Sequence, residues 1–227
     1  MAARVGLLND KVVLKYPIDR LDLSAWKSLD IEHQIFSALG DHERLVKYLG
    51  KVGDGLLFRR AVNGDVRHYM ANAKPGTICN ELRLKWSKQA AQAIQFIHSR
   101  GVVHCDIHPN NFLLDDQLNI LLCDFAGSLL GNLDGEAMES IRFYLPRDPL
   151  ATPTVRTDLF ALGSAMYWIL SDHEPYDNLS ETQVVACFLS KEFPNVDAIP
   201  CGQVVLGCWE GRFSNAGAVV HELSEEC

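Results

Sequence analysis

The strongest constraint on the fold of this chain is a long amphipathic segment that runs into a polar loop and two short apolar stretches. Over residues 80–100, apolar residues recur at helical spacing, and Gly101 is a typical helix stop. After the polar stretch 104–111, residues 112–114 and 120–122 flank a turn and predict a β-hairpin. A fold that accommodates this order must pack helices and strands together.

Shorter patterns predict further elements, which are strands at 12–16 and 56–58, helices at 30–39 and about 157–170, and a turn at 62–65. Pro17 ends the first strand, while Asp30 is a suitable cap for the first helix and Gly40 its stop. Thr157 or Asp158 opens the second helix.

The distribution of these elements predicts the fold class. Strands gather in the first quarter of the chain and helices follow, so we predict an α+β fold with two lobes. We expect a single domain of residues 1–227, divided at the turn into a small β-rich N-lobe of about residues 1–61 and a larger helical C-lobe of about 62–227.

Composition excludes several classes of protein. The 227 residues are 48% hydrophobic and 22% charged, which is typical of a globular chain with its own core. The net charge is −8 and no dense Lys/Arg run exists, so we expect no nucleic-acid partner. The longest uncharged apolar run, 159–170, is shorter than the roughly 18 residues that a membrane helix needs, so we expect no membrane insertion.

Cysteine usage predicts the compartment. The seven cysteines form no Cys-x-x-Cys pair, so we expect neither a zinc site nor a disulfide framework. Free thiols are typical of reducing compartments. We therefore expect an intracellular location, in the cytoplasm.

Residues that can carry chemistry gather around the predicted hairpin. Asp106 and Asn111 are five positions apart in the polar loop, and Asp124 follows at the exit of the hairpin. Two carboxylates and an amide delivered by the ends of rigid elements can hold a divalent cation. Mg²⁺ suits such oxygen ligands and usually keeps water and phosphate oxygens as its other ligands. One carboxylate would remain to accept a proton.

These segments resemble the signature of a eukaryotic-type protein kinase. His104–Asn111 is similar to the family's His-Arg-Asp-x-x-x-x-Asn loop, and Asp124–Ala126 to its Asp-Phe-Gly segment. Other stretches resemble family segments at family-like spacing, namely Val12–Lys15, Leu145–Arg147, Asp158–Gly163 and Cys208–Arg212. The resemblance extends over about residues 4–224 and implies the two-lobed kinase fold.

The resemblance implies roles in phosphoryl transfer. Asp106 would orient the acceptor hydroxyl of a protein substrate and take its proton, with His108 beside it as a further catalytic residue. Asn111 and Asp124 would hold Mg²⁺ against the phosphates. Pro109 favours Ser/Thr over Tyr as the acceptor.

The resemblance also implies a nucleotide site for ATP. Lys15 would neutralise the phosphates and help catalysis, positioned by Glu32, which lies in a predicted helix. Phe58 occupies the position of the gatekeeper residue. Arg59 and Ala61 would then belong to the hinge that receives adenine.

On the nucleotide side, the chain departs from the family pattern twice. No Gly-x-Gly-x-x-Gly loop precedes Lys15, where Gly6 is the single glycine. Ala126 replaces the glycine of the Asp-Phe-Gly segment, although Gly127 follows it. Both changes are compatible with ATP binding, and we expect them to slow transfer.

On the substrate side, three family residues are replaced. His108 stands in place of a lysine, and Cys105 in place of the arginine that receives a phosphate on the activation loop. Arg147 replaces a glutamate whose usual partner is an arginine, which Arg212 resembles. We therefore expect regulation without activation-loop phosphorylation, because a cysteine cannot bind a phosphate as an arginine does.

Two alternative functions remain open. The missing glycine loop favours a pseudokinase, a scaffold module with residual nucleotide affinity. The form His-x-Asp-x-His-Pro-x-Asn over His104–Asn111 favours a small-molecule phosphotransferase of the aminoglycoside or choline kinase type. Against the latter, Asp158–Gly163 and Cys208–Trp209 resemble protein kinases.

Overall fold

The computed structural model describes residues 3–225 apart from 75, 136–137 and 149. The strands are β1 (Ala3–Asn9), β2 (Val12–Pro17), β3 (Tyr48–Val52), β4 (Gly55–Arg59), β5 (Val102–Val103), β6 (Phe112–Leu114), β7 (Ile120–Leu122), β8 (Leu129–Leu130) and β9 (Leu133–Asp134). The helices are α1 (Leu23–Leu39), α2 (Val66–Asn72), α3 (Asn80–Ser99), α4 (Val155–Ser171), α5 (Glu181–Leu189), α6 (Gly202–Glu210) and α7 (Ala216–Glu225), with short 3₁₀ turns at Pro109–Asn111 and Ile141–Phe143.

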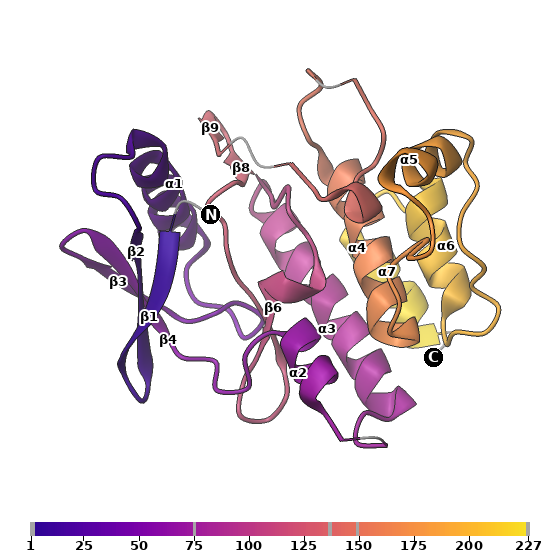
Figure 1. The fold of residues 1–227 in the computed structure, drawn as a ribbon, viewed down its shortest axis with the longest axis horizontal. Coiled ribbons are helices and arrows are strands. Elements are labelled where there is room, and N and C mark those ends of the chain that lie inside the picture. The colour runs from indigo at the N-terminus through magenta and orange to yellow at the C-terminus, as the bar shows by residue number, and fades with distance from the viewer. Residues whose placement is uncertain (1–2, 75, 136–137, 149, 226–227) are drawn as a thin grey trace.

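A four-stranded antiparallel sheet in the order β1-β2-β4-β3 forms one end of the molecule, with α1 packed beside it (Figure 1). Its register sets Lys15 of β2 between Val5 of β1 and Leu56 of β4. One stripe of α1 is buried and includes Glu32 and Phe36. The sheet therefore presents Lys15 and the helix presents Glu32 to the same interior.

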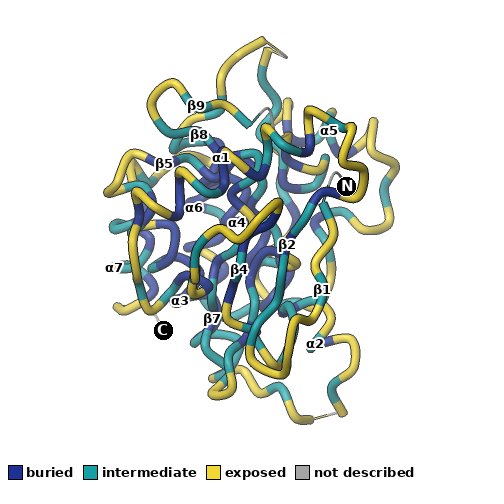
Figure 2. Tube along the Cα trace, turned by 90° about the vertical axis from the view of Figure 1, so that its left-hand side faces the viewer, coloured by how far each residue is buried: buried dark blue, intermediate teal, exposed yellow. Residues whose placement is uncertain are grey.

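The other end is helical, and its centre is α4 (Figure 1). The apolar run predicted from the sequence lies in α4, where nearly every residue from 157 to 170 is buried against α3, α6 and neighbouring segments (Figure 2). Helices α4 and α6 approach closely at Gly163, where an added Cβ would lie 2.7 Å from the Cβ of Cys208. The molecule thus has the predicted α+β fold, with a small sheet-bearing part and a larger helical part. The lobe boundary at 61/62 stays a prediction.

The predicted central elements are confirmed. Strand β2, strand β4 around 56–58, and the helix that ends before Gly101 lie where the patterns place them. Strands β6 and β7 pair as an antiparallel hairpin, with Phe112 opposite Leu122. The strong periodicity of α3 and the turn between β6 and β7 are local signals, and such signals are enough to predict these elements from the sequence.

The predicted start of the first helix is wrong. Helix α1 begins at Leu23 rather than after Asp30, because Asp22 is the actual cap. The Asp22 Oδ1 accepts the backbone N–H groups of Ser24 and Ala25 at 2.9 and 3.3 Å, which satisfies donors that the first helical turn leaves free.

The start of α4 is also earlier than predicted. The helix begins at Val155, and the residue before it, Thr154, is the cap. Thr157 is therefore the third helical residue instead of the first, and its Oγ1 accepts the N–H of Thr154 at 3.0 Å. This reciprocal arrangement of cap and third residue defines the helix start.

The cysteines that the structure describes divide into two kinds. Cys79, Cys105, Cys123, Cys187 and Cys208 are free thiols. Cys201 is disulfide-bonded, so the expectation of free thiols is wrong at this position and the intracellular location stays a prediction. Among the described residues, no helix is long and apolar enough to span a membrane, and no group of three or more His, Cys, Asp or Glu side chains could bind a metal ion.

Candidate active site

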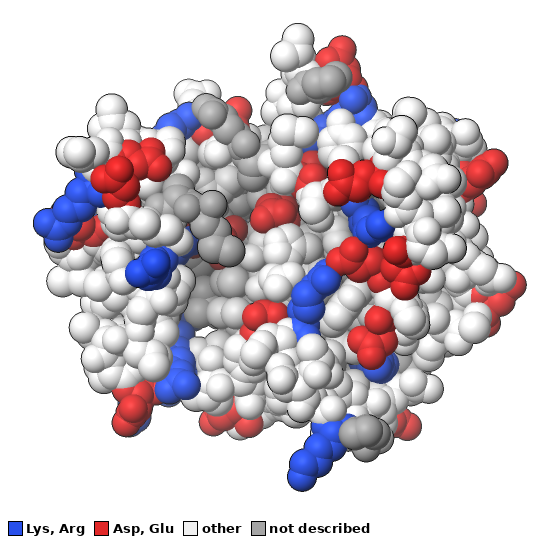
Figure 3. All heavy atoms as spheres, viewed as in Figure 1, with Lys and Arg blue, Asp and Glu red and all other residues white. Residues whose placement is uncertain are grey.

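A cavity of about 1040 Å³ lies between the four-stranded sheet and the segment that follows β7. Val5, Val13 and Leu113 line it with apolar groups, and Lys15 and Asp124 add charge. The visible face is hollowed between the two parts of the molecule, and its charges of both signs are interspersed (Figure 3). An apolar cavity with a few charged groups is typical of a site for a small molecule.

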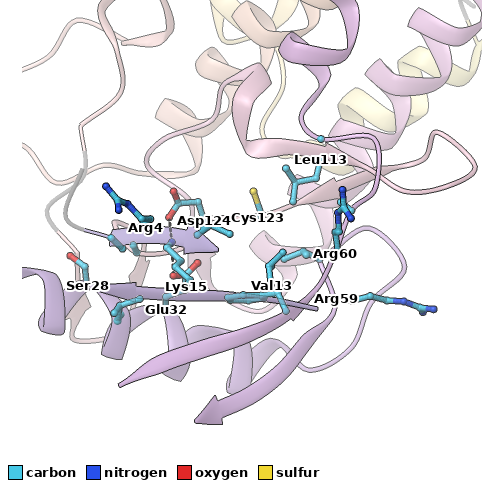
Figure 4. Close-up of a pocket in the computed structure, with 18 of the residues that line it drawn as sticks. Arg4, Val13, Lys15, Ser28, Glu32, Arg59, Arg60, Leu113, Cys123 and Asp124 are labelled. Carbon is cyan, nitrogen blue, oxygen red and sulfur yellow. Dashed lines mark hydrogen bonds and ion pairs between the residues drawn. The ribbon is translucent and has the colours of Figure 1, made fainter. Parts of the chain in front are cut away.

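A charged cluster of three residues occupies one end of this cavity (Figure 4). The Nζ of Lys15 lies 2.6 Å from Oε2 of Glu32 and 2.8 Å from Oδ1 of Asp124. The side chains of Lys15 and Glu32 are 11% and 2% exposed, whereas that of Asp124 is 46% exposed and faces the cavity. Strand β2, helix α1 and the end of the hairpin therefore meet at a single ammonium group.

Burial and charge act in opposite directions on this cluster. Burial alone would lower the pKa of Lys15, but the carboxylates of Glu32 and Asp124 outweigh it and raise this pKa. Burial raises the pKa of Glu32, with the Lys15 charge opposing. At Asp124, burial would raise the pKa, but the charge and hydrogen bond of Lys15 lower it below its usual range. Lys15 is therefore cationic and Asp124 anionic at neutral pH.

Phe125 fixes the backbone next to Asp124. Its side chain is fully buried and packs edge-on against Phe36 of α1, with ring centroids 4.9 Å apart. Its N–H donates to Oε1 of Glu32 at 3.3 Å. Asp124 itself has a φ of 65°, in the left-handed region that non-glycine residues rarely adopt. The buried ring and the bond to Glu32 hold this conformation, which turns the carboxylate toward Lys15.

The polar loop before β6 brings Asp106, His108 and Asn111 together. Asn111 Nδ2 donates to the backbone oxygen of Asp106 at 2.8 Å and to its Oδ2 at 3.2 Å. His108 Nε2 lies 3.4 Å from the same Oδ2. Since His108 Nδ1 accepts the N–H of Asn110 at 3.1 Å, the neutral ring carries its hydrogen on Nε2, facing Asp106.

Backbone contacts join this loop to the cavity. The N–H of Cys123, the residue before Asp124, donates to the backbone oxygen of Asn111 at 3.0 Å. The oxygen of Cys123 in turn accepts a hydrogen bond from His104 Nε2 at 3.0 Å. The hairpin and the loop therefore bring Asn111 next to the segment that carries Asp124.

Asp158, at the start of α4, holds the beginning of the loop. It is fully buried, and its Oδ2 and Oδ1 accept the N–H groups of His104 and Cys105 at 2.7 and 3.0 Å. His98 Nε2 contacts the same Oδ2 at 2.8 Å. These bonds stabilise the left-handed conformation of Cys105, whose φ is 66°. No sequence pattern connects His98, 60 positions away, with this carboxylate.

The eight predicted site residues fall into two groups. Five line the cavity, namely Lys15, Glu32, Arg59, Ala61 and Asp124. The other three, Asp106, His108 and Asn111, lie outside its lining in the adjoining loop. The Arg59 side chain extends away from the charged cluster, so only its backbone is placed to meet a ligand (Figure 4).

Two walls of the cavity were not expected from the sequence. Residues 3–5 of β1 form one wall, although no strand was predicted before residue 12. The alternation of Val5, Gly6 and Leu7 was the available signal. Gly127 and Gly135 form part of another wall, and their proximity depends on the pairing of β8 with β9, which has no strong local signal.

The segment between Asp124 and α4 carries an ion pair that the sequence did not predict. Arg147 Nη2 lies 2.8 Å from Oε2 of Glu139, whose side chain is completely buried. Arg212, which resembles the usual partner of this region, instead contacts Glu210 at 2.9 Å. Arg147 brings a positive charge to a position where the family has a glutamate, and Glu139 of the same segment compensates that charge.

Comparison with known proteins agrees with this geometry. Residues 9–206 match the family described as "Protein kinase domain". Human receptor-interacting serine/threonine-protein kinase 1 is 25% identical over 204 residues, which cover 75% of this chain and 30% of that protein. The serine/threonine/tyrosine-protein kinase HT1 of Arabidopsis thaliana is 25% identical over 176 residues, which cover 71% of this chain and 45% of that protein.

A third relative is named as a probable inactive kinase. A probable inactive serine/threonine-protein kinase of Dictyostelium discoideum is 27% identical over 183 residues, covering 74% of this chain and 15% of that protein. The chain therefore spans less than half the length of these three curated relatives.

Proposed function

Because the chain belongs to the protein kinase domain family over residues 9–206, we propose that it transfers the γ-phosphate of ATP to a protein hydroxyl, with Ser/Thr preferred over Tyr. The observation that carries this proposal is the contact of Lys15 with both Glu32 and Asp124, at 2.6 and 2.8 Å, at the end of an apolar cavity. A cation held between two acids at a cavity wall suits a phosphate chain. The backbone of Arg59 and Ala61 would receive adenine.

Asp106 is the proposed proton acceptor. Its Oδ2 is engaged by Asn111 and His108, and no described residue bonds its Oδ1. These contacts orient the carboxylate and leave Oδ1 to accept the hydrogen of an incoming hydroxyl. His108, when protonated, would add positive charge beside the transferred group.

The donor set fits Mg²⁺. Asn111 directs its Nδ2 at Asp106, so its amide oxygen faces away and is available as a ligand. The Asp124 carboxylate is anionic and half exposed to the cavity. When bound, Mg²⁺ would neutralise phosphate charge, and Asn111 and Asp124 are the residues that would hold it.

A nucleotide-binding module without transfer is the second candidate. It is supported by Ala126, which stands in place of the glycine of the Asp-Phe-Gly segment, and by similarity to a relative described as probable inactive. Both candidates require Lys15 and the cavity. They differ only in whether Asp106 acts on an acceptor.

Thermal-shift titration with ATP, with and without Mg²⁺, followed by a radiolabelled transfer assay on generic protein substrates, tests the proposal. We expect stabilisation by ATP–Mg²⁺ and labelled protein. Lys15→Met should remove both, whereas Lys51→Met should change neither, because Lys51 pairs with Asp30 of α1 at 3.7 Å on the surface. Stabilisation without transfer would favour the second candidate, and labelling of aminoglycosides or choline instead of protein would favour a small-molecule phosphotransferase.

A further inference from the structure

Ser128, four positions after Asp124, is completely buried, and its hydroxyl reaches the polar loop. Its Oγ donates to the backbone oxygen of His104 at 2.9 Å. The N–H of Ser128 donates to the oxygen of Phe125 at 3.1 Å, so the chain turns tightly between Asp124 and this hydroxyl. The side chain therefore links the segment that carries Asp124 to the loop that carries Asp106.

His104 is the point where these bonds converge. Its N–H donates to Asp158, its Nε2 donates to the oxygen of Cys123, and its Nδ1 accepts the N–H of Asp106 at 3.3 Å. With Ser128 on its oxygen, all four polar groups of His104 are bonded. Cys123 lies before Asp124 and Ser128 after it, so His104 holds both sides of that residue.

Close backbone packing holds Ser128 in this position. Its oxygen accepts the N–H of Gly135 at 3.3 Å, at the end of the β8–β9 hairpin. A Cβ at Gly135 would lie 2.4 Å from the oxygen of Ala126 and 2.4 Å from the Cα of Gly127. Only glycine permits this approach, and the approach packs the segment against the loop.

We propose that Ser128 is a positioning residue that fixes Asp124 and Asp106 relative to each other through His104. The hydroxyl can donate to His104 only while the segment after Asp124 lies in its present place. Without the hydroxyl, the buried oxygen of His104 loses its partner, which favours conformations that expose it to water. The functional consequence rests on the proposed phosphotransferase function, but the positioning itself is a property of the fold.

The test compares Ser128→Ala with Ser87→Ala. Ser87 is an equally buried serine whose Oγ donates to a backbone oxygen, that of Arg83 at 3.0 Å within α3. Hydrogen–deuterium exchange of residues 103–111 should be faster in Ser128→Ala than in wild type and unchanged in Ser87→Ala. Ser128→Thr, which keeps the hydroxyl, should restore protection, and Ser128→Cys, which keeps the volume with a weak donor, should be intermediate.

Kinetics separate positioning from simple loss of fold. Ser128→Ala should lower kcat about tenfold, equivalent to one ordinary hydrogen bond, while KM for ATP stays within about twofold. Equal exchange in Ser128→Ala and wild type, or equal acceleration in both alanine variants, overturns the positioning role. If wild-type protein transfers no phosphate, the proposed function fails while the exchange comparison still decides the role of Ser128.

Discussion

The cavity end around Lys15 and the segment from Gly127 to Arg147 are stabilised by buried charge in two different ways. At Lys15, three charges from three elements far apart in the sequence meet, and each matches the family pattern. Between Gly127 and Arg147, the ion pair of Glu139 with Arg147 joins residues eight positions apart and departs from that pattern. The difference indicates that the charges at the cavity depend on the packing of three separate elements, whereas the charge of Arg147 is compensated locally.

The largest expected effect is in the loop that adjoins the first region, at the proposed proton acceptor. Asp106→Asn should lower the transfer rate by about 10²- to 10⁴-fold, because a proton acceptor is lost. Stabilisation by ATP–Mg²⁺ should persist, since Asp106 does not line the cavity. Transfer rates measured beside the thermal shift check both statements, and a variant with full activity would remove Asp106 from the mechanism.

Removing one partner of the Glu139–Arg147 ion pair in the second region should lower the free energy of unfolding. Glu139→Ala leaves Arg147, only 14% exposed, without its partner, and we expect unfolding free energy to fall by about 3 kcal/mol. Chemical denaturation measures this loss. The exposed ion pair of Glu210 with Arg212 supplies the control, because Glu210→Ala should change the free energy of unfolding by less than about 1 kcal/mol.

A double variant separates the pair from other contacts of Glu139. Glu139→Ala with Arg147→Ala should lose less than the sum of the single losses, because no buried charge is left alone. Additive losses would mean that the pair is not coupled.

Asp124→Asn tests cation binding in the first region. The variant should still bind ATP but lose the Mg²⁺-dependent part of its stabilisation. In wild type, ligand at 100 times its dissociation constant stabilises by about 2.7 kcal/mol, which a thermal shift resolves easily. An unchanged Mg²⁺ response would exclude Asp124 as a ligand.

A smaller effect is expected at His108. Its ring lies 3.4 Å from Asp106, and a lysine would bring a permanent charge to the same place. His108→Lys should therefore raise the transfer rate severalfold between about pH 8 and 6.5, because lysine stays protonated throughout this range. Steady-state rates over this range provide the measurement, and a slower variant would contradict the proposed charge effect.

Removing any phosphate groups bound to side chains of the second region should not change the transfer rate. Cys105 is completely buried, donates weakly to the oxygen of Val103 at 3.4 Å and offers no cationic contact to a phosphate. Phosphatase treatment of the purified protein should therefore leave transfer unchanged. A large loss of activity would show that another cation receives a phosphate on this segment.

The sequence alone predicted most of the first region and little of the second. Local periodicity was enough for α3 and the β6–β7 hairpin, and the spacing around Asp106, Asn111 and Asp124 led to the site. The starts of α1 and α4 were misplaced because several nearby polar residues compete as caps. The contacts of Ser128 and Glu139 were missed because a buried hydroxyl or carboxylate has no periodic signal, and its partner is chosen by tertiary packing.

The bond from Asp158 to His104 has a consequence for the order in which the chain acquires its structure during synthesis. Asp158 lies 54 positions after His104, so the loop with Asp106 cannot reach its final geometry until α4 has left the ribosome. At typical elongation rates of about 5–20 residues per second, that delay lasts roughly 3–10 s. A nascent chain that ends before Asp158 would contain the complete four-stranded sheet but an unanchored loop. The contacts proposed for a nucleotide would therefore form several seconds before the residues proposed for transfer are in place.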